Sequence, residues 1–202
     1  MASEIDISNL ALGRLGDDAT VASLYPPEGS AQAEHCARFY PVARDTLLEM
    51  HGWGFATKRA TLAAVSGYSG AWAYAYAIPG DCIKVFTVLP VGATDEAAEA
   101  HDFVRELLPS GQVAVCTNQP VATIKYLARV TDTTKFSPLF VDVLAWLLAS
   151  YLAGPIIKGD AGMKMAQQCF GVAMSILGRA TASDANQRHG EPTHTVGWIA
   201  GR

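Results

Sequence analysis

Residues 136–155 read FSPLFVDVLAWLLASYLAGP, a stretch that would be apolar on every side of a helix and so determines what the rest of the chain must cover. Ser137 can accept backbone N–H groups as an N-cap, and Pro138 fits the first helical position, where no N–H is needed. Gly154-Pro155 is typical of a helix end. The stretch therefore predicts one long helix that buries most of its surface.

Length alone also permits this helix to cross a membrane. About 18 residues at 1.5 Å per residue give roughly 27 Å, close to the thickness of a bilayer core. Asp142 lies one turn inside the helix, where a carboxylate in lipid would be costly, and no basic cluster flanks the stretch closely. We therefore expect a buried core helix, with a small membrane protein as an alternative.

A second helix is expected from about residue 160 to residue 179, antiparallel to the first across a short link. Its larger apolar residues recur at spacings of three and four, and they are Met163, Ala166, Phe170, Met174 and Leu177. This hairpin cannot by itself cover a helix that is apolar all round. We expect Trp146, Leu147 and Phe170 to lie in the core of a larger bundle or in a contact between subunits.

The missing partners are predicted at the N-terminal end of the chain. Ser3 can cap a first helix whose apolar face includes Ile7 and Leu10, and Ser30 can cap a second. Pro41 falls inside the second helix and should bend or divide it. Two helices from each end of the chain would form a four-helix bundle around residues 136–155.

Between the helical ends the hydrophobic period changes from 3.6 to 2, which indicates strands. Six segments qualify, and they are 55–61, 72–77, 82–89, 103–107, 112–117 and 121–130. Pro79 and Gly80 suit a type II turn, so a tight hairpin is expected to pair the second segment with the third. Pro109 to Gly111 makes another turn, between the fourth and the fifth.

Residues 183–202 are polar and rich in turn-forming residues, yet they end in VGWIAGR. A segment that cannot form a core, tipped with Trp198 and Ile199, suggests an arm that docks on a partner. The alternative is a frayed tail whose Trp198 folds back on its own domain. The sequence thus predicts an α+β chain, divided into bundle helices (1–52), a β-rich domain (53–131), the helical hairpin (132–182) and a C-terminal arm (183–202).

The amino-acid composition limits the classes of function that the chain can have. Of 202 residues, 50% are hydrophobic and 17% charged, which is enough for a sizeable core, and the net charge of −4 gives little support to DNA recognition through phosphates. The acidic N-terminus does not resemble a signal peptide. The four cysteines are scattered and indicate buried thiols.

The segment HGEPTH (189–194) is a poor metal site because Pro192 interrupts it, and we predict no catalytic residue, metal or cofactor.

The order of motifs resembles the tail tubular protein A family, the head-to-tail adaptors of short-tailed bacteriophages. The similar blocks are EIDISNLALGRLGD, YPVARDTLLEMHGWGFATKRATLA, WAYAYAIPGDCIKVFTVLP, TIKYLARVTDTTKFSPLFVDVLAWLLASYLAGPI and the terminal WIAGR. They are distributed from residue 4 to residue 202, so the resemblance extends along almost the whole chain. The most specific are W-x-F-A-x-x-R-A-x-L-A and W-x-Y-x-Y-x-x-P-x-D-C-I-x-V.

The resemblance implies a structural virion protein rather than an enzyme. Members of the family form a dodecameric ring under the portal protein, above the tail nozzle protein, and the genome passes through the channel without sequence-specific binding. Their C-terminal arm reaches the portal, which would assign docking to Trp198, Ile199 and Arg202. Such a subunit would assemble in the host cytoplasm, away from membranes. A tail-associated peptidoglycan hydrolase is the other alternative, although no residue pair supports that activity.

Overall fold

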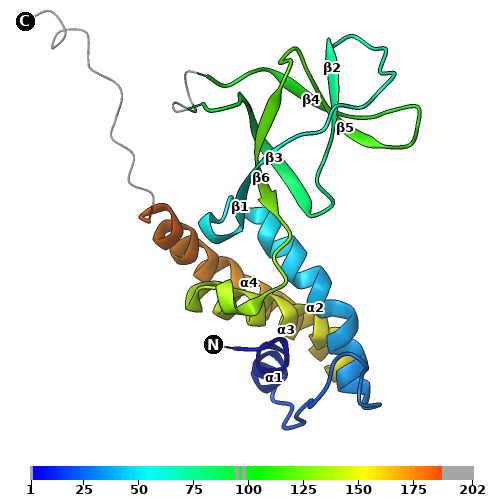
Figure 1. Cartoon of the computed structure of the whole chain (residues 1–202). Helices are drawn as coiled ribbons and strands as arrows, with labels where there is room; N and C mark the ends of the chain where they lie inside the picture. The colour runs from blue at the N-terminus through cyan, green and yellow to red at the C-terminus, as the bar shows by residue number, and fades with distance from the viewer. Residues whose placement is uncertain (1, 94–95, 97–98, 188–202) are drawn as a thin grey trace, which may run out of the picture.

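The computed structural model describes residues 2–93, 96 and 99–187, and this part of the chain confirms the predicted α+β class. It contains four α-helices and six β-strands (Figure 1). The helices are α1 (Glu4–Arg14), α2 (Ala31–Met50), α3 (Pro138–Ile157) and α4 (Gly159–Ala185). The strands are β1 (Thr57–Thr61), β2 (Tyr74–Ala77), β3 (Cys82–Pro90), β4 (Phe103–Leu107), β5 (Val113–Thr117) and β6 (Ala122–Ala128).

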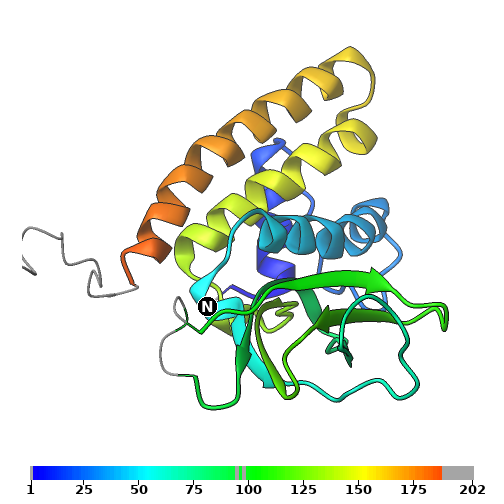
Figure 2. The ribbon, with the colours of Figure 1, turned by 90° about the horizontal axis from the view of Figure 1, so that it is seen from above.

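Helix α3 is the central element of the bundle. It packs against α4 on one side and against α1 and α2 on the other, and only Pro138 and Gly154 among its residues are exposed. Figure 2 shows α4 on the outside of the bundle, with α3 between it and the other two helices. In the described residues α3 alone is long and apolar enough to span a membrane, but three helices cover it here, as expected of a core helix.

The end of α3 and the continuity of α2 differ from the sequence prediction. Helix α3 continues through Gly154-Pro155 to Ile157 and ends at Lys158, whose φ is 62° and whose N–H bonds to the carbonyl of Gly154. A proline in the last turn removes one hydrogen bond only, and the neighbouring bonds keep the helix continuous. Helix α2 likewise runs undivided through Pro41.

The buried face of α4 is not the predicted one. Its buried residues are Gly162, Cys169, Ala173, Ile176, Ala180 and Asp184, about a quarter turn from the predicted stripe. Phe170 is 45% exposed, so of the two places predicted for it the bundle core is wrong, and the subunit contact stays a prediction. Small residues let α4 approach α3 closely, since a Cβ at Gly162 would lie 2.9 Å from the carbonyl oxygen of Ala153. The larger residues are therefore displaced to the flank.

The strands form two antiparallel three-stranded sheets, in the orders β1-β6-β3 and β2-β5-β4. The β4–β5 hairpin forms around Pro109 to Gly111 as predicted, but the hairpin expected between β2 and β3 is wrong. Tyr76 of β2 pairs with Val115, and Val85 of β3 pairs with Tyr126. The turn before Cys82, whose N–H bonds to the carbonyl of Pro79, passes the chain from one sheet to the other.

The sheets stack on one end of the bundle in layers. Leu127, Ile83 and Phe86, on one face of β1-β6-β3, pack into the same hydrophobic core as the helices. The opposite face packs on the second sheet through a core that includes Ile124 and Val115. Residues 53–131 are thus in direct hydrophobic contact with the bundle, and the bundle fixes the orientation of the strands.

Candidate assembly surfaces

The predicted docking residues Trp198, Ile199 and Arg202 lie outside the described residues, as does the segment HGEPTH. Leu147 is fully buried in the bundle, whereas Trp146 is only partly buried at its edge. The residues expected in a shared core or subunit contact therefore occupy different environments. Leu147 stabilises the subunit, and Trp146 borders a surface.

Trp146 belongs to a cluster that fastens α1 to α3. The guanidinium of Arg14 lies 4.4 Å from the centre of the Trp146 ring, donates a 2.9 Å hydrogen bond to the Asp142 carbonyl and forms an ion pair with the Asp142 carboxylate. Burial lowers the pKa of Arg14, and the nearby Asp142 opposes that shift. Asp142 was the one charge in the apolar stretch. It is an interhelical partner of Arg14, a role that the sequence did not reveal.

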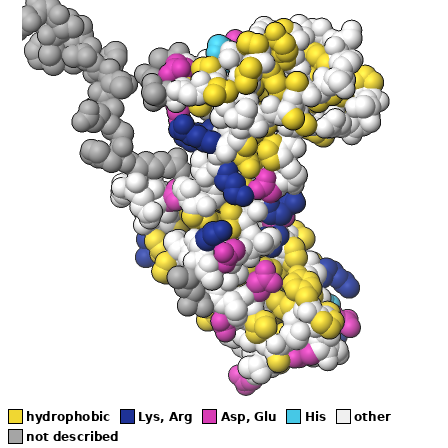
Figure 3. Space-filling view, viewed as in Figure 1, with side chains coloured by type: hydrophobic (Ala, Val, Ile, Leu, Met, Phe, Trp, Pro, Cys, Tyr) yellow, Lys and Arg dark blue, Asp and Glu magenta, His cyan; other side chains and the backbone are white. Residues whose placement is uncertain are grey.

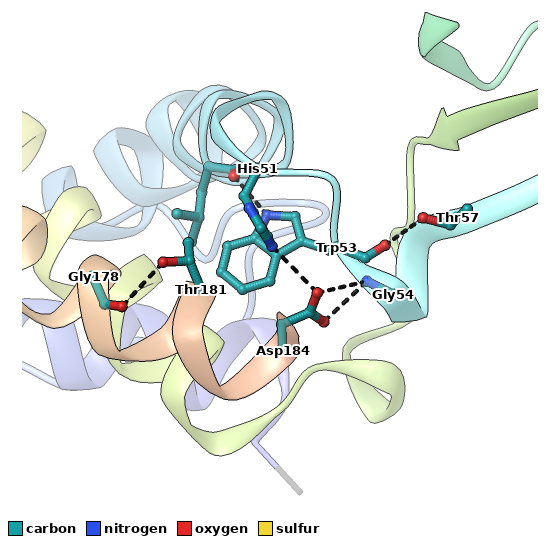
Figure 4. A network of polar contacts seen from close by, with 8 residues as sticks. His51, Trp53, Gly54, Thr57, Gly178, Thr181 and Asp184 are labelled. Carbon is teal, nitrogen blue, oxygen red and sulfur yellow. Dashed lines mark hydrogen bonds and ion pairs between the residues drawn. The ribbon is translucent and has the colours of Figure 1, made fainter. Parts of the chain in front are cut away.

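A second polar cluster fixes the end of α4, from which the chain continues toward residue 188 (Figure 4). Asp184 is 8% exposed, and its two carboxylate oxygens accept the backbone N–H of Gly54 at 2.9 and 3.1 Å. His51 Nε2 lies 3.3 Å from the same carboxylate. The helix thus extends past the boundary predicted at residue 182, because a partner from the α2–β1 connection satisfies Asp184.

The connection that holds Asp184 is itself anchored by Trp53. This side chain is 1% exposed, and its indole N–H donates a 2.9 Å hydrogen bond to the carbonyl of Leu47 at the end of α2. Its ring packs edge-on against Phe140 of α3 at 5.0 Å and lies 6.0 Å from Phe55. The start of the β-rich domain, the start of α3 and the end of α4 therefore meet at one rigid point.

A third cluster ties the strands together and links them to the bundle. Asp81 accepts hydrogen bonds from Lys58 at 2.7 Å and from the hydroxyl of Tyr126 at 3.1 Å. Its backbone carbonyl accepts the N–H of Arg129, whose side chain pairs with Asp45 of α2 at 2.8 Å. Burial, together with the bond to Asp81, raises the pKa of Tyr126 to about 12. These groups position the sheets on the helices.

Large apolar side chains remain exposed on both parts of the molecule. In the view of Figure 3, hydrophobic groups gather over the strands at the top, while charged groups of both signs are interspersed below them. On β4 and β5 the exposed large apolar residues are Val104, Leu107 and Val113. On the bundle they include Leu10, Val42, Met163, Phe170 and Val172. Such residues are candidates for contacts with other chains.

The described residues contain no group of three or more His, Cys, Asp or Glu side chains placed to hold a metal ion. All four cysteines are free, and burial raises the pKa of Cys36 to about 11. At neutral pH that thiol is protonated and unreactive.

Neither a comparison with protein-family models nor one with curated protein sequences finds a match to this chain.

Proposed function

We propose that the chain is a head-to-tail adaptor of a short-tailed bacteriophage, a structural virion protein that joins the portal to the tail nozzle. Copies of the chain form a ring, a dodecamer by the resemblance, through which the genome passes without sequence-specific contacts. Residues 188–202 dock on the portal through Trp198, Ile199 and Arg202. Assembly takes place in the host cytoplasm.

One observation supports this proposal beyond the motifs themselves: three of the blocks that resemble the adaptor family supply the residues of the two clusters that set the strands on the bundle. Trp53 and Phe55, from the W-x-F-A block, pack on Phe140. Asp81, from the P-x-D-C-I block, bonds Lys58 and Tyr126. These residues fix the orientation of the strands on the bundle, and with it the point where α4 ends.

A binding experiment tests the proposal. The full chain should co-sediment with portal-bearing, DNA-filled heads that lack tails, and electron microscopy should show a ring at the portal. Truncation after Gln187, which keeps Asp184, should leave the melting temperature nearly unchanged and abolish attachment. Trp198→Ala should reproduce most of that loss. Attachment that survives truncation would contradict the docking role of residues 188–202, and a chain that never binds heads would contradict the adaptor function itself.

A further inference from the structure

The bundle carries two surfaces of opposite character on different helices. The chain from α1 to α2, residues 4–50, holds eight carboxylates and three arginines. The surface of α4 between Asp160 and Asp184 holds Lys164 and Arg179 and no carboxylate. Helix α3 separates α4 from α1 and α2, so the two surfaces are distinct (Figure 2).

The α4 surface combines charge with large apolar groups. Met163 is 63% exposed and Phe170 is 45% exposed, and they lie seven residues apart on one face, about 10 Å along the helix. Lys164 is exposed about 100° around the helix from Met163, whereas exposed Arg179 lies on the side opposite Phe170, and neither cation forms an ion pair with another described residue. Within the described residues, no other side chain covers Met163 and Phe170 enough to bury them.

The surface of α1 has an apolar hollow of about the same length as the exposed apolar face of α4. An open, mostly apolar depression of about 580 Å³ is lined by Asp6, Asn9, Leu10, Gly13 and Arg14. Leu10 is 47% exposed, and the space beside Gly13 is open, since a Cβ added there would meet no atom within 4 Å. The hollow spans two turns of α1, about the separation of Met163 and Phe170. Exposed Asp18, just past the helix, is one of the carboxylates that give this side its negative charge.

We infer that α4 of one copy docks on the α1 hollow of the next copy, with Phe170 and Met163 against Leu10 and Gly13. Lys164, at the edge of this contact, then faces the acidic α1–α2 side of the neighbour, and Arg179 lies outside the contact. Because the two surfaces differ, the contact is head-to-tail and repeats around a ring, where an isologous contact would stop at a dimer. This inference rests on the proposed ring and identifies its subunit interface.

The test uses the full chain and three matched variants, each placing a carboxylate at an exposed apolar position. Phe170→Asp disables the α4 surface, Leu10→Asp disables the α1 surface, and Val121→Asp alters an exposed apolar position of the β-rich domain as the control. Particle mass is measured by light scattering, alone and on portal-bearing heads, beside a thermal melt. If an aspartate variant melts at a lower temperature than the unmodified chain, Phe170→Ser or Leu10→Ser replaces it.

The unmodified chain and the control should assemble. The two interface variants should remain at the 21.4 kDa of a single chain, with subunit affinity weakened roughly 30-fold, the effect of losing a central anchor. Mixed in equal amounts, they should form a dimer and no ring, because one intact α4 and one intact α1 surface remain. If either variant assembles normally while heads still bind it, the inferred interface is wrong and the adaptor function stands. If the unmodified chain neither assembles nor binds heads, both are wrong.

Discussion

Replacing Asp184 with alanine should destabilise the subunit although no core side chain is removed. The carboxylate is 8% exposed, and it accepts the one backbone N–H of Gly54 through both oxygens, with His51 3.3 Å away. A hydrogen bond to a charged group contributes about 1.5–3 kcal/mol. Loss of about 2 kcal/mol corresponds to a fall of roughly 4–8 °C in the melting temperature of a chain of this length.

The assay is a thermal melt of Asp184→Ala beside Ser183→Ala, which alters an exposed neighbour on the same helical turn. Asp184→Asn, which keeps an acceptor oxygen but removes the charge, should fall between the alanine variant and the unmodified chain. A variant that lacks residues 184–202 should melt at as low a temperature as the alanine variant, whereas a variant that lacks only residues 188–202 should not. If Asp184→Ala melts within a degree of the control, the carboxylate does not hold the end of α4.

The remaining predictions concern other buried or paired groups. Trp53→Ala should lower the free energy of unfolding by about 3–5 kcal/mol, because a fully buried aromatic side chain is lost. Denaturant unfolding of the variant beside the unmodified chain measures this difference. Trp53→Phe should cost about 1–3 kcal/mol by leaving the carbonyl of Leu47 without its donor. Leu147→Ala should cost about 2–5 kcal/mol in the same assay, since the side chain is fully buried. The hydrogen bond from Lys58 lowers the pKa of Asp81 in the folded protein below its ordinary value of 3.8. The ionised carboxylate therefore contributes its full stabilisation above pH 3.8, and this contribution is lost as the pH falls through the pKa of Asp81 in the folded protein. Asp81→Asn should therefore lower the melting temperature at neutral pH and lose this effect in strong acid.

The elements were predictable where the signal is local. Ser3, Ser30 and Ser137 each accept the backbone N–H three residues on, as the capping rule requires. The alternation of strand residues indicated six strands, and six are present in the described residues. Strand partners were harder to predict, because a turn before Cys82 reverses the chain whether or not the flanking strands pair. Pairing was decided instead by which strands could share the core between the two sheets.

The end of α4 was not predictable for a different reason. A carboxylate in the last turn of a helix is unfavourable, since it faces the negative end of the helix dipole, and local rules place the end before it. Asp184 is tolerated because the N–H of Gly54, 130 residues earlier, points at it. The partner of Asp142 is similarly distant, since Arg14 lies 128 residues away. Long-range polar pairs of this kind leave no periodic trace in the sequence.

The displaced face of α4 connects the fold to assembly. Periodicity identified the large apolar residues correctly, but close packing on α3 required small ones, and Ala173 and Ala180 took the buried positions. A helix that served only its own subunit would have no use for Met163 and Phe170 on its exposed flank, where they lower solubility. Met163 and Phe170, seven residues apart on one flank, are the side chains that the proposed subunit contact would cover. Of the predicted stripe, Ala166, Met174 and Leu177 pack against the edge of the bundle core, and under our proposal the next subunit covers Met163 and Phe170.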